Sequence, residues 1–182
     1  LGGRSIEHAM MMLIPSAWET DKAMPTDLKN FYKYHACLME PWDGPAAIAF
    51  SDGIKVGAVL DRNGLRPARY ILTKDNIVVM SSEAGVLDIS PDRILASGKI
   101  EPGKMLLIDT ALGKIIEDPE IKNAMAKAQN YGSWLKKNMV EFTALRSKNK
   151  KEDAIKDLPA LEKAFGYTRE DMKFIIKPMA EK

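Results

Sequence analysis

The sequence offers little material for disulfide or metal chemistry. Its 182 residues include one cysteine, Cys37, which excludes an internal disulfide and a multi-cysteine zinc or iron–sulfur site within the chain. Only two histidines, His8 and His35, are present, so we expect no self-contained metal site. The sequence also lacks a P-loop and a Gly-x-Gly-x-x-Gly pattern, the usual signatures of nucleotide binding.

Long apolar runs and an excess of charge of one sign are missing as well. No stretch approaches the ~20 apolar residues that cross a bilayer, and the N-terminus has no signal-peptide pattern. The 27 basic and 25 acidic residues nearly balance, which disfavours a polyanion bound by bulk charge. We therefore expect no membrane or nucleic-acid partner and a cytoplasmic location. Because the sequence starts at Leu1 without an initiator methionine, we expect a fragment or a processed product.

Apolar residues recur at helical spacing at both ends of the chain. Ser5 can cap the first helix and Pro15 follows it as a stop signal, while Pro41 steers the residue before it away from helical angles. The predicted helices cover 5–14, 27–39, 118–139 with a break near 131–133, 159–165 and 168–180. The polar, charge-rich stretch 143–157 predicts a linker.

Between residues 44 and 117 the pattern indicates strands. Turn signals at Asp52-Gly53, Lys74-Asp75-Asn76 and Leu112-Gly113 predict three successive hairpins. The predicted strands are 46–50, 55–60, 70–73, 77–80, 104–109 and 114–116. Hairpins without helices between them favour antiparallel sheet and an α+β fold. The first strand is apolar on both faces, so we expect it to be buried between layers.

The densest group of functional side chains lies in the stretch 61–70. Three arginines and one aspartate at a strand-to-strand corner can hold a carboxylate or phosphate, or they can pair with one another and with neighbouring backbone. Residue types alone favour the second interpretation. Ser81-Ser82-Glu83 follows a strand, and we expect a hydrogen-bonded strand end there rather than a nucleophilic serine. The candidate supporting residues are Asp61, Arg62, Asn63, Gly64, Arg66, Pro67, Ser82 and Glu83.

Cys37 and His35 are weak candidates for catalysis. Cys37 falls near the C-terminal end of the second predicted helix, where the helix dipole disfavours a thiolate. We expect it to be half-buried and without a nucleophilic role. His35 lies in the apolar stripe of the same helix, which favours a hydrogen-bonded core histidine.

Several motifs resemble a known family. Gly44 with Ala46–Phe50, Asp61-x-x-Gly64-x-Arg66-Pro67, Ser82-Glu83 and Leu87-Asp88 resemble the class II glutamine amidotransferases, which are N-terminal-nucleophile hydrolases. Longer matches are similar to glutamate synthase large subunits: Gly2–Ser5, Met11–Pro15, Tyr34–Ala46, Asp61–Pro67 and Tyr131–Leu135. The tail, Ala164–Ile175 with Pro178–Ala180, resembles the start of the central domain of those subunits. The resemblance covers almost the whole chain, except roughly 143–157.

The resemblance implies part of a four-layer αββα sandwich of antiparallel sheets, followed by C-terminal helices. Residues 1–142 would be the C-terminal part of the amidotransferase domain, 143–158 a linker and 159–182 the start of the central domain. The family nucleophile, an N-terminal cysteine, would lie upstream of Leu1, so we expect no catalytic residue in this chain. The 61–67 motif would support the site or an interdomain face.

The resemblance also implies the parent reaction, in which glutamine and 2-oxoglutarate give two glutamates. The parent would use FMN and an iron–sulfur cluster, neither held by this chain, with a small subunit or ferredoxin as electron donor. Two alternatives remain open: a separately encoded, non-catalytic scaffold subunit, or part of another class II amidotransferase. Strands that lack their normal neighbours would leave open edges, so self-association is a further expectation.

Overall fold

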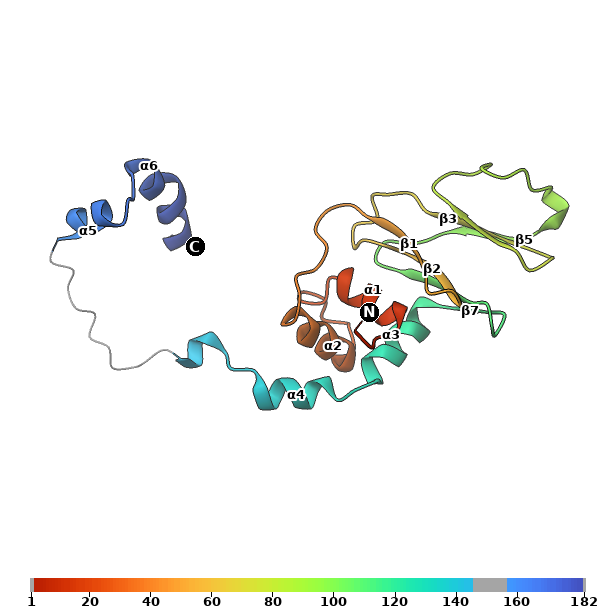
Figure 1. Cartoon of the computed structure of the whole chain (residues 1–182), viewed down its shortest axis with the longest axis horizontal. Coiled ribbons are helices and arrows are strands. Elements are labelled where there is room, and N and C mark those ends of the chain that lie inside the picture. Colours follow the sequence, from red (N-terminus) through yellow and green to blue (C-terminus); the bar gives the residue numbers. More distant parts are fainter. Residues whose placement is uncertain (1, 146–156, 182) are drawn as a thin grey trace. The chain divides into compact units, whose positions relative to one another are not determined.

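The structure, a computed structural model, describes residues 2–145 and 157–181 (Figure 1). The chain divides into two compact units, Leu1–Met139 and Val140–Lys182. The described residues of unit 1 form a 3-10 helix, Pro91–Arg93, and four α-helices: α1 (Ile6–Leu13), α2 (Thr26–Ala36), α3 (Asp118–Lys127) and α4 (Tyr131–Asn138). Its strands are β1 (Ala47–Ser51), β2 (Lys55–Leu60), β3 (Arg69–Thr73), β4 (Val78–Ser81), β5 (Ile94–Lys99), β6 (Met105–Asp109) and β7 (Lys114–Ile116).

The strands of unit 1 form two antiparallel sheets. Sheet A has the order β1-β2-β6-β7 and sheet B the order β4-β3-β5. The three predicted hairpins are present as β1–β2, β3–β4 and β6–β7. In the second hairpin Asn76 adopts a φ of 63°, a left-handed conformation that asparagine tolerates better than most residues. The predicted α+β class with antiparallel sheets is therefore confirmed.

A helical layer covers one face of sheet A (Figure 1). The core between them contains Met11 of α1, Phe31 of α2 and Leu107 of β6, each at most 2% exposed. Helix α2 packs against α1, α3 and α4, and buried Tyr131 of α4 stacks edge-on against Phe31. Glu7 of α1 also forms a 2.8 Å ion pair with Lys55 of β2, which joins the helical layer to the sheet.

The other face of sheet A meets sheet B through a second, smaller core. Buried Leu60 of sheet A packs there with Ala68 and Ile100, which flank sheet B. The chain passes between the sheets twice at this place, outward between β2 and β3 and back between β5 and β6. Unit 1 thus supplies a helical layer and two stacked sheets of the expected sandwich.

Unit 2 is helical in its described part. It contains a 3-10 helix, Phe142–Leu145, then α5 (Leu158–Ala164) and α6 (Arg169–Asp171), which continues through a π-helical turn (Met172–Ile176) into α7 (Lys177–Ala180). Thr168 and Asp171 form a reciprocal capping box at the start of α6. The predicted linker lies largely outside the described residues, and the proposed boundaries at 142 and 158 stay predictions.

Some local predictions were wrong. Strand β1 is an edge strand that pairs only with β2 among the described residues. Ala47 and Ala49 are exposed instead of buried, because no described layer covers the face of β1 from which they project. Strand β5 was not predicted at all. Helix α2 ends at Ala36 instead of Met39, and the break between α3 and α4 precedes Tyr131, where the Asn130 side chain caps α4.

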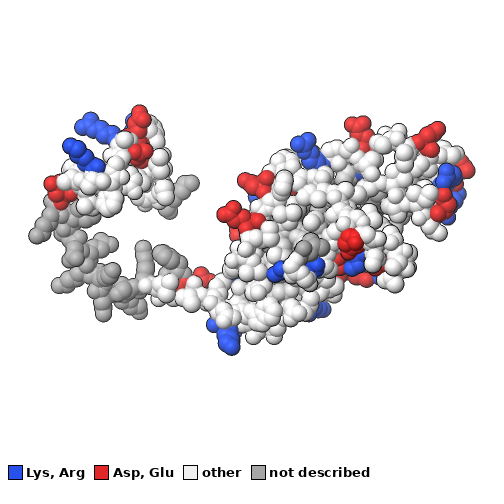
Figure 2. Space-filling view, in the orientation of Figure 1, with Lys and Arg blue, Asp and Glu red and all other residues white. Residues whose placement is uncertain are grey.

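No helix in the described ranges 2–145 and 157–181 is both long and apolar enough to cross a membrane. Charged side chains of both signs are interspersed over the face of unit 1 that Figure 2 shows. That distribution agrees with the near balance of charge in the sequence.

Candidate functional site

The candidate site is built around Asp61, the first residue after β2. Its carboxylate is buried and accepts three backbone hydrogen bonds, from Ala46 N at 3.1 Å, Asn63 N at 2.9 Å and Gly64 N at 3.3 Å. Burial raises the pKa of this carboxyl, but the backbone donors outweigh it and hold the pKa below its usual range. Asp61 is thus an ionised anchor for the corner that leads from sheet A to sheet B.

The return crossing braces this corner. Gly103 N donates to the Asp61 carbonyl oxygen at 2.9 Å, and Ile100 N donates to Ala68 O at 2.9 Å. Gly64 adopts a φ of +60°, and a Cβ at this position would lie 2.6 Å from Cγ of Pro102. Only glycine meets both the conformation and the close contact, which accounts for the Asn-Gly step in the motif.

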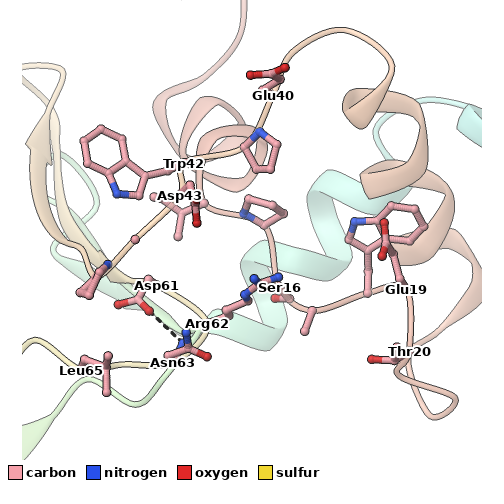
Figure 3. A pocket seen from close by; sticks show the side chains of 17 residues that line it. Ser16, Glu19, Thr20, Glu40, Trp42, Asp43, Asp61, Arg62, Asn63 and Leu65 are labelled. Carbon is pink, nitrogen blue, oxygen red and sulfur yellow. Dashed lines mark hydrogen bonds between the residues drawn. The ribbon is translucent and has the colours of Figure 1, made fainter. Parts of the chain in front are cut away.

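On one side of the corner lies an open pocket of about 600 Å³ (Figure 3). Three segments line it: 14–20 after α1, 40–45 after α2, and the corner itself with Asp61, Arg62, Asn63 and Leu65. Hydrogen bonds hold these segments in place: Trp42 N donates to Leu13 O at 2.8 Å, and the hydroxyls of Ser16 and Tyr32 are 3.2 Å apart. Burial raises the pKa of Tyr32 to about 12, so this hydroxyl stays protonated.

The side chains in this pocket suit binding better than covalent catalysis. Trp18 and Trp42 offer aromatic faces, and Glu19, Glu40 and Asp43 offer carboxylates. The Arg62 side chain extends from the corner toward the Ser16 side of the pocket (Figure 3). The lining contains a single serine and neither a histidine nor a cysteine, so it holds no nucleophile–base pair of the Ser–His or Cys–His kind.

The structure divides the predicted site residues between two pockets. Asp61, Arg62 and Asn63 line the pocket just described, whereas Gly64, Arg66 and Pro67 line a second pocket of about 390 Å³ on the sheet B side. Ser82 and Glu83 line neither; they follow β4, whose last residue, Ser81, pairs with Arg69. The Ser81 hydroxyl donates to Glu83 O, which agrees with the expected hydrogen-bonded strand end.

His8 and His35 form a hydrogen-bonded pair between α1 and α2. Nδ1 of His35 is 2.8 Å from Phe31 O, and because a carbonyl only accepts, Nδ1 carries the proton. The two Nε2 atoms are 2.8 Å apart, so in the neutral pair His8 donates to His35. Burial lowers the pKa of His8 to about 4, with smaller contributions from His35 and Arg4, and burial also lowers the pKa of His35. The expectation of a hydrogen-bonded core histidine at 35 is confirmed.

Cys37 differs from its prediction in burial, and the expectation that it has no nucleophilic role stays a prediction. The residue caps the C-terminal end of α2 and is exposed instead of half-buried, because the helix ends there. Its thiol donates to Lys33 O at 3.4 Å. The thiol therefore bonds to the backbone of the last turn of α2.

The residues of this chain do not fit an iron–sulfur cluster. Such clusters are held by about four cysteine thiolates, and the sequence has one cysteine. Within the part of the chain that the structure describes, no group of three or more His, Cys, Asp or Glu side chains is placed to hold a metal ion.

Sequence reasoning missed the residues that adjoin the motif in space. Trp18 and Trp42 were not candidates because helix ends, which no local pattern relates to the 61–67 turn, bring them to the first pocket. Lys99 lines the second pocket through β5, the strand that went unpredicted. Gly98, which follows the short run Ile94–Ala96, was the available signal for a strand with a close neighbour.

Comparison with known proteins identifies the family to which this chain belongs. The family model described as "Glutamine amidotransferases class-II" matches residues 1–134. The chain therefore belongs to the class II glutamine amidotransferases, as the motif resemblance predicted.

The relatives that match over almost the whole chain are glutamate synthases. The chain is 45% identical to the glutamate synthase [NADPH] large chain of Bacillus subtilis over 98% of its length. It is 43% identical to the ferredoxin-dependent glutamate synthase of Pyropia yezoensis over 98%, and 40% identical to the glutamate synthase [NADH] of Schizosaccharomyces pombe over 97%. The matched regions make up only 9–12% of these relatives.

Proposed function

We propose that this chain forms the framework part of the glutamine-hydrolysing domain of a glutamate synthase large subunit, without the nucleophile of that domain. The observation that carries the proposal is the 40–45% identity to glutamate synthases over 97–98% of the chain, including unit 2, which lies beyond the amidotransferase match. The complete enzyme would convert glutamine and 2-oxoglutarate into two glutamates. A different class II amidotransferase would not be expected to share unit 2.

In this function the chain supports the glutamine-hydrolysing site and supplies no catalytic residue. Asp61 and the crossing at 100–104 fix the corner between the two sheets, and the corner holds Arg62 and Arg66 in opposite pockets. Cys37 is unsuited to be the nucleophile for the reasons given above. The reacting cysteine would belong to another part of the complete enzyme, and the corner would support the wall behind it or a face toward the next domain.

The partners of this chain follow from the same proposal. It would pack against the remainder of the large subunit, which would bind FMN and an iron–sulfur cluster and take electrons from a small subunit or from ferredoxin in the cytoplasm. The relatives include NADPH, NADH and ferredoxin-dependent glutamate synthases, so the similarity fits either kind of electron donor. Strand β1, an edge of sheet A, offers a site for another strand of that subunit or for self-association.

The test uses the complete synthase polypeptide that contains this sequence. We expect Arg66→Ala to lower glutaminase activity or its coupling to glutamate formation, because it removes a cation that the corner holds in place. Cys37→Ser should leave both unchanged, and Lys22→Ala, an exposed surface cation, is the matched control. The 182-residue chain alone should release no ammonia from glutamine. Ammonia release that Cys37→Ser abolishes would overturn the proposal, as would wild-type glutaminase activity and coupling in Arg66→Ala.

A further inference from the structure

The second pocket beside the corner has a concentrated positive charge. Its floor consists of Leu60, Ala68 and Ile100, which belong to the core between the sheets. Three cations line its rim, Arg66, Arg69 and Lys99.

The three cations have no anionic partner within the described ranges of the chain. None of Arg66, Arg69 and Lys99 forms an ion pair with a described side chain. The one carboxylate that lines the pocket, Glu101, forms a 2.7 Å ion pair with Lys104. The lining of this pocket thus carries three cations and one carboxylate, and the carboxylate is paired with Lys104.

The strand register makes this arrangement unfavourable in the free protein. Arg69 of β3 lies directly opposite Lys99 of β5. Like charges at directly opposed positions destabilise an antiparallel pair, whereas opposite charges stabilise it. A bound anion between the two would turn the repulsion into attraction, so the register itself points to an anionic ligand.

The backbone that carries these cations is rigidly held. Ile100 N donates to Ala68 O at 2.9 Å directly beside the Arg69–Lys99 pair. Gly64 packs against Pro102, and Pro67 restricts the backbone between Arg66 and Arg69. The cations therefore start from a preorganised frame, which reduces the entropy lost when a ligand binds.

The exposure of the site decides between small and extended ligands. Arg66, Arg69 and Lys99 are all exposed, and a single exposed ion pair contributes only about 0.2–1 kcal/mol. A small anion would bind weakly on that basis, whereas a chain with several carboxylates can engage all three cations together. Leu65, which is 69% exposed, and Pro102 add apolar surface on the same rim.

We propose that this pocket, formed by Arg66, Arg69, Lys99 and Leu65, is a docking site for an acidic polypeptide segment that also carries apolar side chains. Carboxylates of the segment lie between Arg69 and Lys99, and the guanidinium of Arg66 takes a further carboxylate in a forked arrangement. The inference does not depend on the proposed function, because it uses only the charges and register of unit 1.

The test measures fluorescence anisotropy of a fluorescein-labelled peptide of alternating Glu and Leu with the 182-residue chain. We expect saturable binding that weakens as salt is raised. The double variant Arg69→Gln/Lys99→Gln should weaken binding by about tenfold, because two of the three charge contacts are lost. The matched control Lys22→Gln/Lys136→Gln removes the same net charge from exposed positions elsewhere and should change binding less than about twofold.

Stability provides a second measurement that does not use the peptide. Because Arg69 and Lys99 repel each other in the free chain, Arg69→Gln/Lys99→Gln should unfold at an equal or higher urea concentration than the wild type. Equal losses of peptide binding in both double variants would overturn the proposal, as would the absence of binding at low salt. Equally effective competition by succinate or inorganic phosphate, or tighter binding of a single-stranded oligonucleotide, would also overturn it.

Discussion

Replacing Asp61 by asparagine tests the corner most directly. The substitution keeps the size of the side chain but removes its charge and turns one acceptor oxygen into an N–H donor. In the native corner one oxygen accepts from Ala46 N and the other from Asn63 N and Gly64 N. The amide can serve only one side, so on the other side a donor faces a backbone donor.

The expected loss can be worked from these contacts. Hydrogen bonds to a charged group contribute about 1.5–3 kcal/mol each, and a buried donor left without an acceptor costs about 1–3 kcal/mol. Water at the pocket edge relieves part of this cost, so we expect Asp61→Asn to lower the free energy of unfolding by about 2–4 kcal/mol. Asp43→Asn is the matched control, because Asp43 lines the same pocket and has no hydrogen bond within the part of the chain that the structure describes.

The assay is urea unfolding of the 182-residue chain, followed by circular dichroism and by tryptophan fluorescence. Two of the three tryptophans, Trp18 and Trp42, line the same pocket as Asp61, so most of the fluorescence signal comes from this part of unit 1. We expect Asp43→Asn to stay within about 0.5 kcal/mol of the wild type. An equally small effect of Asp61→Asn would refute the reasoning, since it would mean that the three backbone contacts contribute nothing to stability.

The same residue predicts a pH dependence. The folded pKa of Asp61 lies below 3.8, so near this pH the unfolded chain binds more protons than the folded chain. Stability from Asp61 is therefore fully present above pH 3.8 and falls as the pH is lowered through the folded pKa. In Asp61→Asn this part of the acid destabilisation should disappear, and its persistence would assign it to other carboxyls.

Two further predictions concern packing and the histidine pair. The pKa of His8 is about 4 in the folded chain and 6.5 ordinarily, so the unfolded chain binds more protons between these values. The free energy of unfolding should therefore fall by about 1–2 kcal/mol from pH 6.5 to pH 4, a value already reduced for the partly exposed ring. Urea titrations at several pH values should show a smaller fall in His8→Gln. Gly57→Ala should cost about 2–3 kcal/mol, because its Cβ would lie 2.6 Å from Leu106 O, whereas Gly132→Ala should be neutral or stabilising, since the obstacle is only the amide end of Asn30.

The sequence allowed the hairpins and the helical layer to be predicted because their signals are local. Turn residues such as Asp52-Gly53 define a hairpin within a few positions, and the Phe31 stripe defines a buried helix face in the same way. Burial of the β1 side chains could not be predicted, because it depends on which layer packs against each face of the strand. An apolar run such as 46–50 specifies a strand but not whether both of its faces are covered.

The candidate site shows the same limit more sharply. The 61–67 motif predicts a tight corner. The backbone that braces this corner, however, comes from residues 100–104, about forty positions later, and Lys99 of β5 adds a positive charge to the second pocket. Strand β5 has no alternating pattern, because Gly98 provides room for the Tyr70 ring, which lies 2.6 Å from where a Cβ would be. Gly98 thus allows the cross-strand contact but weakens the strand signal in the sequence. As a result, neither β5 nor the pairing of Lys99 with Arg69 could be predicted. The strand register places the positive charges of Arg69 and Lys99 opposite each other, and this register is set by the sheet as a whole.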